Sequence, residues 1–297
     1  DRPWMIAHIG AEIDLTESQE LTILAGSFEA NGLHPLKGKA SKYYMTAPYG
    51  LVVRYDKGVQ FNYELKDKVE KILSASLSVI DGDGVLGQSS VTPSDSRANS
   101  YPSGSGSLEI QIMNALQKIA SDLPINLNNH NLYLGVNGSY GDTGSYKGEK
   151  RRQNDLTTYL GYMVKTSKGE GEIRVFHSQF DRNLTNDGNG NHTPVVTSQG
   201  HGLEVAFRNF ETKYCDAGIY GNYHEFESNA ADGEFTWGEV RQVKGWTVGL
   251  SCNNFKKVNN LNFGIEYGQM DTFNQNGEEI NNEKLVSVVF SYKFGTR

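Results

Sequence analysis

The stretch Leu261-Asn262-Phe263-Gly264-Ile265-Glu266-Tyr267 decides the fold. Leucine, phenylalanine, isoleucine and tyrosine occupy alternate positions, and asparagine, glycine and glutamate stand between them. Successive side chains of a β-strand point to opposite faces, so this stretch predicts a strand with one apolar face and one polar face. The same alternation recurs at 59–65, 73–79, 203–208, 246–252 and 286–294.

Two-faced strands of this kind are predicted along most of the chain, and many are 10–13 residues long. Strands of soluble proteins average about 5–6 residues, whereas a tilted membrane-spanning strand needs about 9–11. The predicted strands cover 4–15, 19–30, 57–66, 70–81, 106–117, 130–140, 154–166, 170–181, 200–211, 213–227, 241–254, 257–270 and 284–295.

The connections between these strands alternate in length. Short polar turns are expected at 16–18, 66–69, 167–170, 211–213 and 255–256, with a medium connection at 118–129 on the same side. Long loops rich in Gly, Asn, Ser and Asp are expected at 31–56, 82–105, 141–153, 182–199, 228–240 and 271–283. This layout is typical of a bacterial outer-membrane barrel. We therefore predict an all-β, transmembrane antiparallel β-barrel with short periplasmic turns and long extracellular loops, forming one domain over residues 1–297.

The number of strands is a separate question, because a single-chain bacterial barrel has an even number and thirteen segments are found. Residues 48–56 offer a further strand and would give 14. Alternatively, N-terminal strands are missing from the chain and the full barrel has 16. We favour 14, because an open barrel would leave two unpaired strand edges in lipid.

Composition excludes several other classes of protein. Hydrophobic residues make up 37% of the 297 residues and mean hydropathy is −0.53, with no apolar run near the ~18 residues that a membrane-spanning helix requires. Aromatic residues at 11% are too frequent for a disordered chain. The net charge of −7 argues against a nucleic-acid-binding protein.

Four pieces of residues 8–82 and the two residues that follow combine strand patterns with glycine. They are Ile9-Gly10-Ala11-Glu12, Thr22-Ile23-Leu24-Ala25-Gly26-Ser27-Phe28, Gly58-Val59-Gln60-Phe61-Asn62-Tyr63-Glu64-Leu65 and Leu77-Ser78-Val79-Ile80-Asp81-Gly82-Asp83-Gly84. Together they resemble the Gram-negative outer-membrane porin superfamily, and within it the phosphate-selective porin group. The chain end Phe290-Ser291-Tyr292-Lys293-Phe294 is similar to the aromatic last strand of outer-membrane proteins, although Gly295-Thr296-Arg297 follow it. The resemblance implies a porin in the bacterial outer membrane and assembly as a homotrimer.

The polar face of such a barrel would line the pore. The predicted pore-lining residues are Glu12, Asp14, Gln60, Asn62, Glu64, Glu109, Gln111, Glu172, Arg174, Glu204, Arg208, Asp216, Glu266 and Lys293. Acids outnumber bases among them, so we expect a mild preference for cations. A phosphate-selective pore would instead be expected to carry many Arg and Lys.

Aromatic girdles are expected where the strands cross the two lipid interfaces. Suitable residues are Tyr63, Tyr140, Tyr162, Trp246, Tyr267, Tyr292 and Phe294. Membrane lipid and lipopolysaccharide are therefore expected partners, and a basic group at Lys147, Lys150, Arg151 and Arg152 offers contacts to lipopolysaccharide phosphates or to an anionic solute. A solvated loop explains that group equally simply.

Cys215 and Cys252 lie on adjacent predicted strands, both on the apolar face. Folding that hairpin about 233–234 places them nearly opposite each other, which permits either a disulfide or two free thiols. Asp81-Gly82-Asp83-Gly84 and the Asp and Asn residues of 181–189 look like parts of calcium loops, but turn chemistry explains them as well. No metal site or cofactor is predicted.

No catalytic motif is found, so the chain is not expected to be an enzyme. The interpretation that accounts for most observations is a porin giving passive diffusion of small hydrophilic solutes or ions through a water-filled lumen. Two alternatives remain at this stage. One is a non-conducting outer-membrane barrel that acts as a scaffold, an adhesin or a partner in a complex. The other is a soluble secreted β-sandwich binding protein.

Overall fold

The computed structural model describes residues 7–29, 55–67, 70–80, 103–119, 129–146, 149–184, 196–228, 242–256, 261–274 and 276–292. They form one helix and thirteen strands. The first seven elements are β1 (Ala7–Thr16), β2 (Gln19–Glu29), β3 (Tyr55–Asp67), β4 (Glu70–Ile80), β5 (Ser103–Gln111), α1 (Ile112–Ile119) and β6 (His130–Tyr146). The others are β7 (Glu149–Thr166), β8 (Gly169–Leu184), β9 (Val196–Glu211), β10 (Asp216–Ser228), β11 (Gln242–Asn253), β12 (Leu261–Phe273) and β13 (Glu279–Tyr292).

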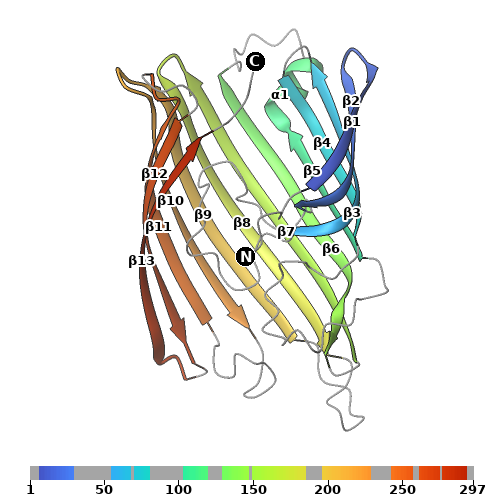
Figure 1. Cartoon of the computed structure of the whole chain (residues 1–297), viewed down its shortest axis with the longest axis vertical. Helices are drawn as coiled ribbons and strands as arrows, with labels where there is room; N and C mark the ends of the chain where they lie inside the picture. Colours follow the sequence, from blue (N-terminus) through green and yellow to red (C-terminus); the bar gives the residue numbers. More distant parts are fainter. Residues whose placement is uncertain are drawn as a thin grey trace.

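The thirteen strands form a single sheet in chain order, each antiparallel to the next. Figure 1 shows this sheet as a curved wall of tilted strands. One continuous sheet argues against the soluble sandwich, which needs two packed sheets. Every predicted strand is found at its expected place in the order. Within the described residues, no pairing joins β1 to β13. Residues 48–54 of the predicted fourteenth strand lie outside those residues.

The prediction of a strand over 106–117 is wrong in its second half. The strand β5 ends at Gln111, and residues 112–119 form α1. Apolar residues recur there at Ile112, Leu116 and Ile119, a helical rather than a strand spacing. Asn114 fixes the helix to the sheet, because its Nδ2 donates a hydrogen bond of 2.8 Å to the backbone oxygen of Lys71.

Two of the predicted long loops are largely strand. Residues 141–153 belong mostly to β6 and β7, with Asp142 paired opposite Arg152. In place of a loop over 271–283, a short connection joins β12 to β13. There the Asn274 side-chain oxygen accepts hydrogen bonds of 2.9 Å from two backbone N–H groups, and Gly277 has a φ of 77°. The prediction failed because strands that continue into water no longer need an apolar face, so their ends resemble loops.

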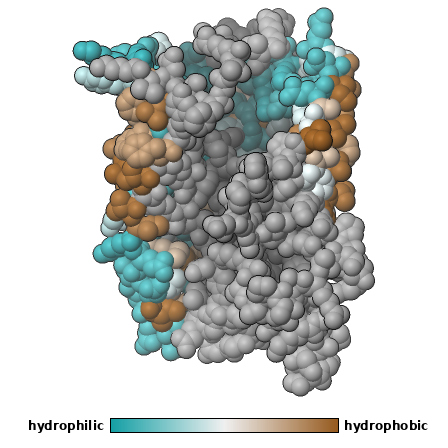
Figure 2. Space-filling model, in the orientation of Figure 1, coloured by the Kyte–Doolittle hydropathy of each residue, from teal (hydrophilic) through white to brown (hydrophobic). Residues whose placement is uncertain are grey.

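The two faces of the sheet differ as the alternation predicts. On β4, Leu77 and Val79 are exposed whereas Ser78 between them is fully buried. On β7, Leu156 and Leu160 are exposed whereas Thr157 is buried. Figure 2 shows the exposed apolar side chains as a band on the outer surface, with hydrophilic residues toward the ends. Exposed apolar and buried polar side chains reverse the usual arrangement of a soluble protein and suit a wall in lipid.

No helix among the described residues is long and apolar enough to cross a membrane.

Candidate functional site

The candidate site is the inner face, which we define as the face opposite the exposed apolar band. Register identifies its residues because directly paired residues point to the same side of a sheet. One such row across five strands is Gln111, Tyr133, Gly161, Arg174 and Glu204. This row brings together, from β5 to β9, residues that lie far apart in the sequence.

Three tyrosines on this face each extend across a glycine of the neighbouring strand. Tyr133 lies over Gly161, Tyr159 over Gly135 and Tyr220 over Gly249. A Cβ atom added to any of these glycines would lie 2.1–2.2 Å from the tyrosine ring. The missing side chain is therefore what lets the ring lie flat against the wall.

Each of these tyrosines then reaches a carboxylate on the strand beyond the glycine. The Tyr159 hydroxyl donates a hydrogen bond of 2.8 Å to Glu109. In the same way, Tyr133 donates to Glu172 and Tyr220 donates to Glu266. We call these contacts Tyr–Gly–Glu bridges: Tyr159–Gly135–Glu109, Tyr133–Gly161–Glu172 and Tyr220–Gly249–Glu266. Each bridge ties three strands together and holds a carboxylate on the inner face.

Two arginines complete this arrangement. Arg174 lies directly opposite Glu204 and donates to its Oε2 from Nη2 (2.5 Å) and from Nε (3.2 Å). Arg208 pairs with Glu172 and approaches Glu170 at 3.5 Å. We call Glu109, Tyr133, Tyr159, Glu172, Arg174, Glu204 and Arg208 the charged cluster. Arg174 is 1% exposed and Glu204 is 3% exposed, so the centre of this cluster is covered by other parts of the chain.

The structure places most of the predicted pore-lining residues on the inner face. Buried there are Gln60, Gln111, Glu172, Arg174, Glu204 and Glu266. Half-buried are Asn62, Glu64, Glu109, Arg208 and Asp216. Glu12 and Asp14 of β1 are exposed, although their register places them with Thr22 and Glu20 on this face. Lys293 lies outside the described residues.

Some of these predicted residues contact one another, and others are separate. The pairs in contact are Glu109 with Gln111, Glu172 with Arg208, Arg174 with Glu204, and Gln60 with Asn62. Asp216 instead accepts a hydrogen bond from Asn254, and Glu64 pairs with Lys66 and Lys71. Sequence reasoning missed these two lysines and the three tyrosines. An inward glycine opposite an aromatic residue would have been the signal for the tyrosines.

The two cysteines form a disulfide, which settles the alternative left open by the sequence. The register differs by two residues from a fold about 233–234, since Cys252 lies opposite Ala217, but the predicted closeness of the two cysteines is confirmed. Cys215 precedes β10, is buried, and has its Cα 5.6 Å from that of Cys252. The bridge lies at the end of the sheet where short turns join the strands. This end is periplasmic in the predicted orientation, and the periplasm is a compartment where disulfides form.

Replacing both cysteines by alanine is expected to lower the free energy of unfolding by roughly 2–4 kcal/mol, since the bridge closes a long loop in the unfolded chain. Urea unfolding of the folded protein in detergent measures this. An unchanged unfolding midpoint would contradict a stabilising role.

Other predicted features have mixed outcomes. Tyr140, Tyr162 and Tyr267 are exposed on the outer face, and the rings of Trp246 and Tyr267 lie 5.3 Å apart. Tyr63 is half-buried, the Tyr292 side chain is not described, and Phe294 lies outside the described residues.

Residues 150–152 of the basic group belong to β7 rather than to a loop, and Lys147 lies outside the described residues. Residues 81–84 and 185–189 of the calcium-like segments also lie outside the described residues. Where the chain is described, no three His, Cys, Asp or Glu side chains are grouped to bind a metal ion.

The fold resembles those of known outer-membrane proteins. The outer membrane channel DcaP of Acinetobacter baumannii has a TM-score of 0.51 and 12% sequence identity, over 93% of this chain and 74% of that one. The chain has the fold of an outer-membrane β-barrel. OmpT of Vibrio cholerae, an outer membrane protein, is a weaker likeness in its trimer form, with a TM-score of 0.47 and 12% identity over 95% of this chain and 86% of that one. No protein-family model and no curated protein matches the sequence.

The likeness to the DcaP channel confirms the predicted fold class at the level of an outer-membrane barrel. It agrees with the predicted location in the bacterial outer membrane, as does the apolar outer band. The phosphate-selective group, closure with 14 strands and a pore-lining role for the inner residues stay predictions.

Proposed function

We propose that this barrel is an outer-membrane channel through which small hydrophilic solutes or ions diffuse passively, with no chemical step. The observation that carries the proposal is the charged cluster on the face opposite the apolar band. Ionised side chains are costly in an apolar surrounding and are tolerated in a wet lumen. The inward residues predicted from the sequence would line that lumen.

The charged cluster would form the narrow part of the path. Its side chains come from five neighbouring strands, β5 to β9, and they are held in place by the Tyr–Gly–Glu bridges and the arginine pairs. A solute that passes this zone would meet the half-buried Glu109 carboxylate and Arg208 guanidinium, which select by charge and size, whereas Arg174 and Glu204 lie beneath the surface. Membrane lipid and lipopolysaccharide are the expected partners of the outer band. Assembly as a homotrimer remains part of the proposal, based on the porin resemblance.

Conductance in planar lipid bilayers tests the proposal. The refolded full chain is expected to produce stepwise current increases, and its liposomes are expected to swell in sugars at rates that fall with sugar size. Heat-denatured protein from the same preparation serves as the control.

A second candidate function is a barrel without an open lumen. The burial of Arg174 and Glu204 favours it, because these inward side chains have almost no contact with solvent. A protein that is folded by heat-modifiable gel mobility but produces no current steps would overturn the channel and support this second candidate.

Ion selectivity offers a further prediction about the lumen. Glu12 and Asp14 carry carboxylates that form no ion pair or hydrogen bond within the described residues, and both are exposed at the inner face of β1. The double variant Glu12→Gln/Asp14→Asn is expected to lower the ratio of potassium to chloride permeability by roughly a factor of two, the effect of removing charges a few ångströms from an ion in water.

The reversal potential in a potassium chloride gradient measures this ratio. Glu211→Gln is the matched control, since Glu211 is exposed and paired with Lys256 beside a short turn. An equal shift in both variants would show that the effect does not come from the lumen.

A further inference from the structure

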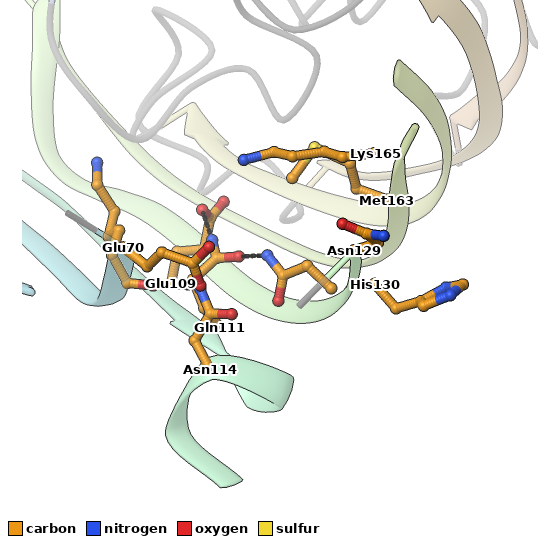
Figure 3. A pocket seen from close by; sticks show the side chains of 10 residues that line it. Glu70, Glu109, Gln111, Asn114, Asn129, His130, Met163 and Lys165 are labelled. Carbon is orange, nitrogen blue, oxygen red and sulfur yellow. Dashed lines mark hydrogen bonds between the residues drawn. The ribbon is translucent and has the colours of Figure 1, made fainter. Parts of the chain in front are cut away.

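A pocket of about 350 Å³ lies at the end of the sheet where short turns join the strands. Its lining comes from the start of β4, the end of β5, α1, the start of β6 and the end of β7, and includes Glu70, Glu109, Gln111, Asn114, Asn131 and Lys165. Figure 3 shows Glu70 and Lys165 on different sides of this space, with Gln111 and Asn114 toward α1. The helix that the sequence did not predict therefore forms part of the pocket.

Most of the polar groups around the pocket are already occupied. Glu109 accepts hydrogen bonds from Tyr159 and Gln111, and Lys71 pairs with Glu64. Asn114 binds the backbone of Lys71. These groups shape the pocket and leave little capacity for a ligand.

Other groups in the lining remain available, and three of them matter for a ligand. Within the described residues, the Glu70 carboxylate and the Lys165 ammonium take part in no ion pair or side-chain hydrogen bond. Asn131 is only 9% exposed, and its Nδ2 donates to Gln111, but its Oδ1 has no hydrogen-bond partner. A buried acceptor without a partner is costly, typically about 1–3 kcal/mol, and a ligand that donates to it removes that cost.

We infer that this pocket is a subsite for a small zwitterion that carries both an ammonium and a carboxylate, such as a free amino acid or a dipeptide. The ammonium would bind Glu70 and donate to Asn131 Oδ1, and the carboxylate would bind Lys165. Opposite free charges on different sides of one pocket suit a solute with both charges better than a simple anion or cation. The inference names a solute class for the proposed channel, and it rests on that function only for how the solute arrives.

Calorimetry on the refolded full chain in detergent tests the inference with three probes. Alanyl-alanine has both charges, its N-acetyl derivative lacks the ammonium, and its C-terminal amide lacks the carboxylate. The dipeptide is expected to bind roughly tenfold more tightly than either derivative. Glu70→Gln should weaken binding of the dipeptide and the amide and leave the N-acetyl derivative unchanged. Lys165→Met should weaken binding of the dipeptide and the N-acetyl derivative and leave the amide unchanged.

Two exposed turn residues at the same end of the sheet supply matched controls, Glu17→Gln and Lys168→Met, and neither should change binding. Absence of dipeptide binding, equal binding of all three probes, or binding unaffected by both pocket variants would overturn the subsite. Because no transport is measured, such a failure leaves the channel proposal intact. A barrel that shows no current steps but binds in this charge-dependent way would support the subsite and remove the channel.

Discussion

Replacing Arg174 by methionine is expected to lower the free energy of unfolding by about 3–5 kcal/mol, because the Glu204 carboxylate would remain buried without the cation that it contacts. Within the described residues, the Glu204 Oε2 accepts hydrogen bonds only from Arg174, and its Oε1 has no partner. Urea unfolding in detergent or in lipid vesicles, followed by tryptophan fluorescence, measures the loss.

Two further variants separate charge burial from loss of packing. Arg174→Met/Glu204→Leu replaces both charges by apolar groups of similar size and is expected to regain most of the stability. Lys256→Met removes one partner of an exposed pair and should cost at most about 1 kcal/mol. Equal losses in Arg174→Met and Lys256→Met would show that the cluster pair contributes no more than a surface pair.

The second large effect is expected at Gly161. Its alanine variant places a Cβ atom 2.1 Å from the Tyr133 ring, and Tyr133 is 1% exposed with its hydroxyl bound to Glu172. The ring is almost fully buried and its hydroxyl is bound, so moving it would disturb its neighbours, and we expect a loss of about 3 kcal/mol and a lower yield of folded barrel. Heat-modifiable gel mobility gives the yield, and urea unfolding gives the free energy.

Gly104→Ala is the control for this substitution, because a Cβ at Gly104 would meet its nearest atoms at an ordinary 3.9 Å. Replacing Tyr133 by a residue with a shorter side chain should restore folding if the clash between the new Cβ and the ring is the cause. The variant Tyr133→Ser/Gly161→Ala is therefore expected to be more stable than Gly161→Ala alone. Additive losses in the double variant would mean that Gly161 is required for another reason.

The sequence was informative where one physical rule acts along the whole strand. Alternation such as Leu73-Ser74-Ala75-Ser76-Leu77-Ser78-Val79 follows from one face in lipid and one in the lumen, and it located every strand of the sheet. The sorting of connections by length likewise follows from the two sides of a membrane. Most of the inward polar residues could therefore be named before their partners were known.

What was missed depends on register and on local competition between structures. The contact of Arg174 with Glu204 and the Tyr–Gly–Glu bridges require knowing which residues lie opposite each other, and a strand pattern does not fix this across a loop of unknown shape. The error in the disulfide register has the same cause. At α1, the spacing of Ile112, Leu116 and Ile119 fits a helix, but the apolar residues were interpreted as part of a strand. The polar ends of β6, β7, β12 and β13 were mistaken for loops because they extend beyond the apolar band.

The proposed function requires that the outer face of the sheet lies against lipid and the inner face lies against water. The strand β4 offers the most direct test of this orientation. Nitroxide spin labels on single cysteines at Ser74, Ser76, Ala75, Leu77 and Val79 report which collision reagent reaches each face, while the native disulfide stays oxidised. Gel mobility confirms that each variant is folded. We predict that labels at Ala75, Leu77 and Val79 collide mainly with lipid-soluble oxygen, and labels at Ser74 and Ser76 mainly with a water-soluble nickel chelate. Equal access of the nickel chelate to both faces, or the reverse pattern, would contradict a lipid-facing outer band around a polar lumen.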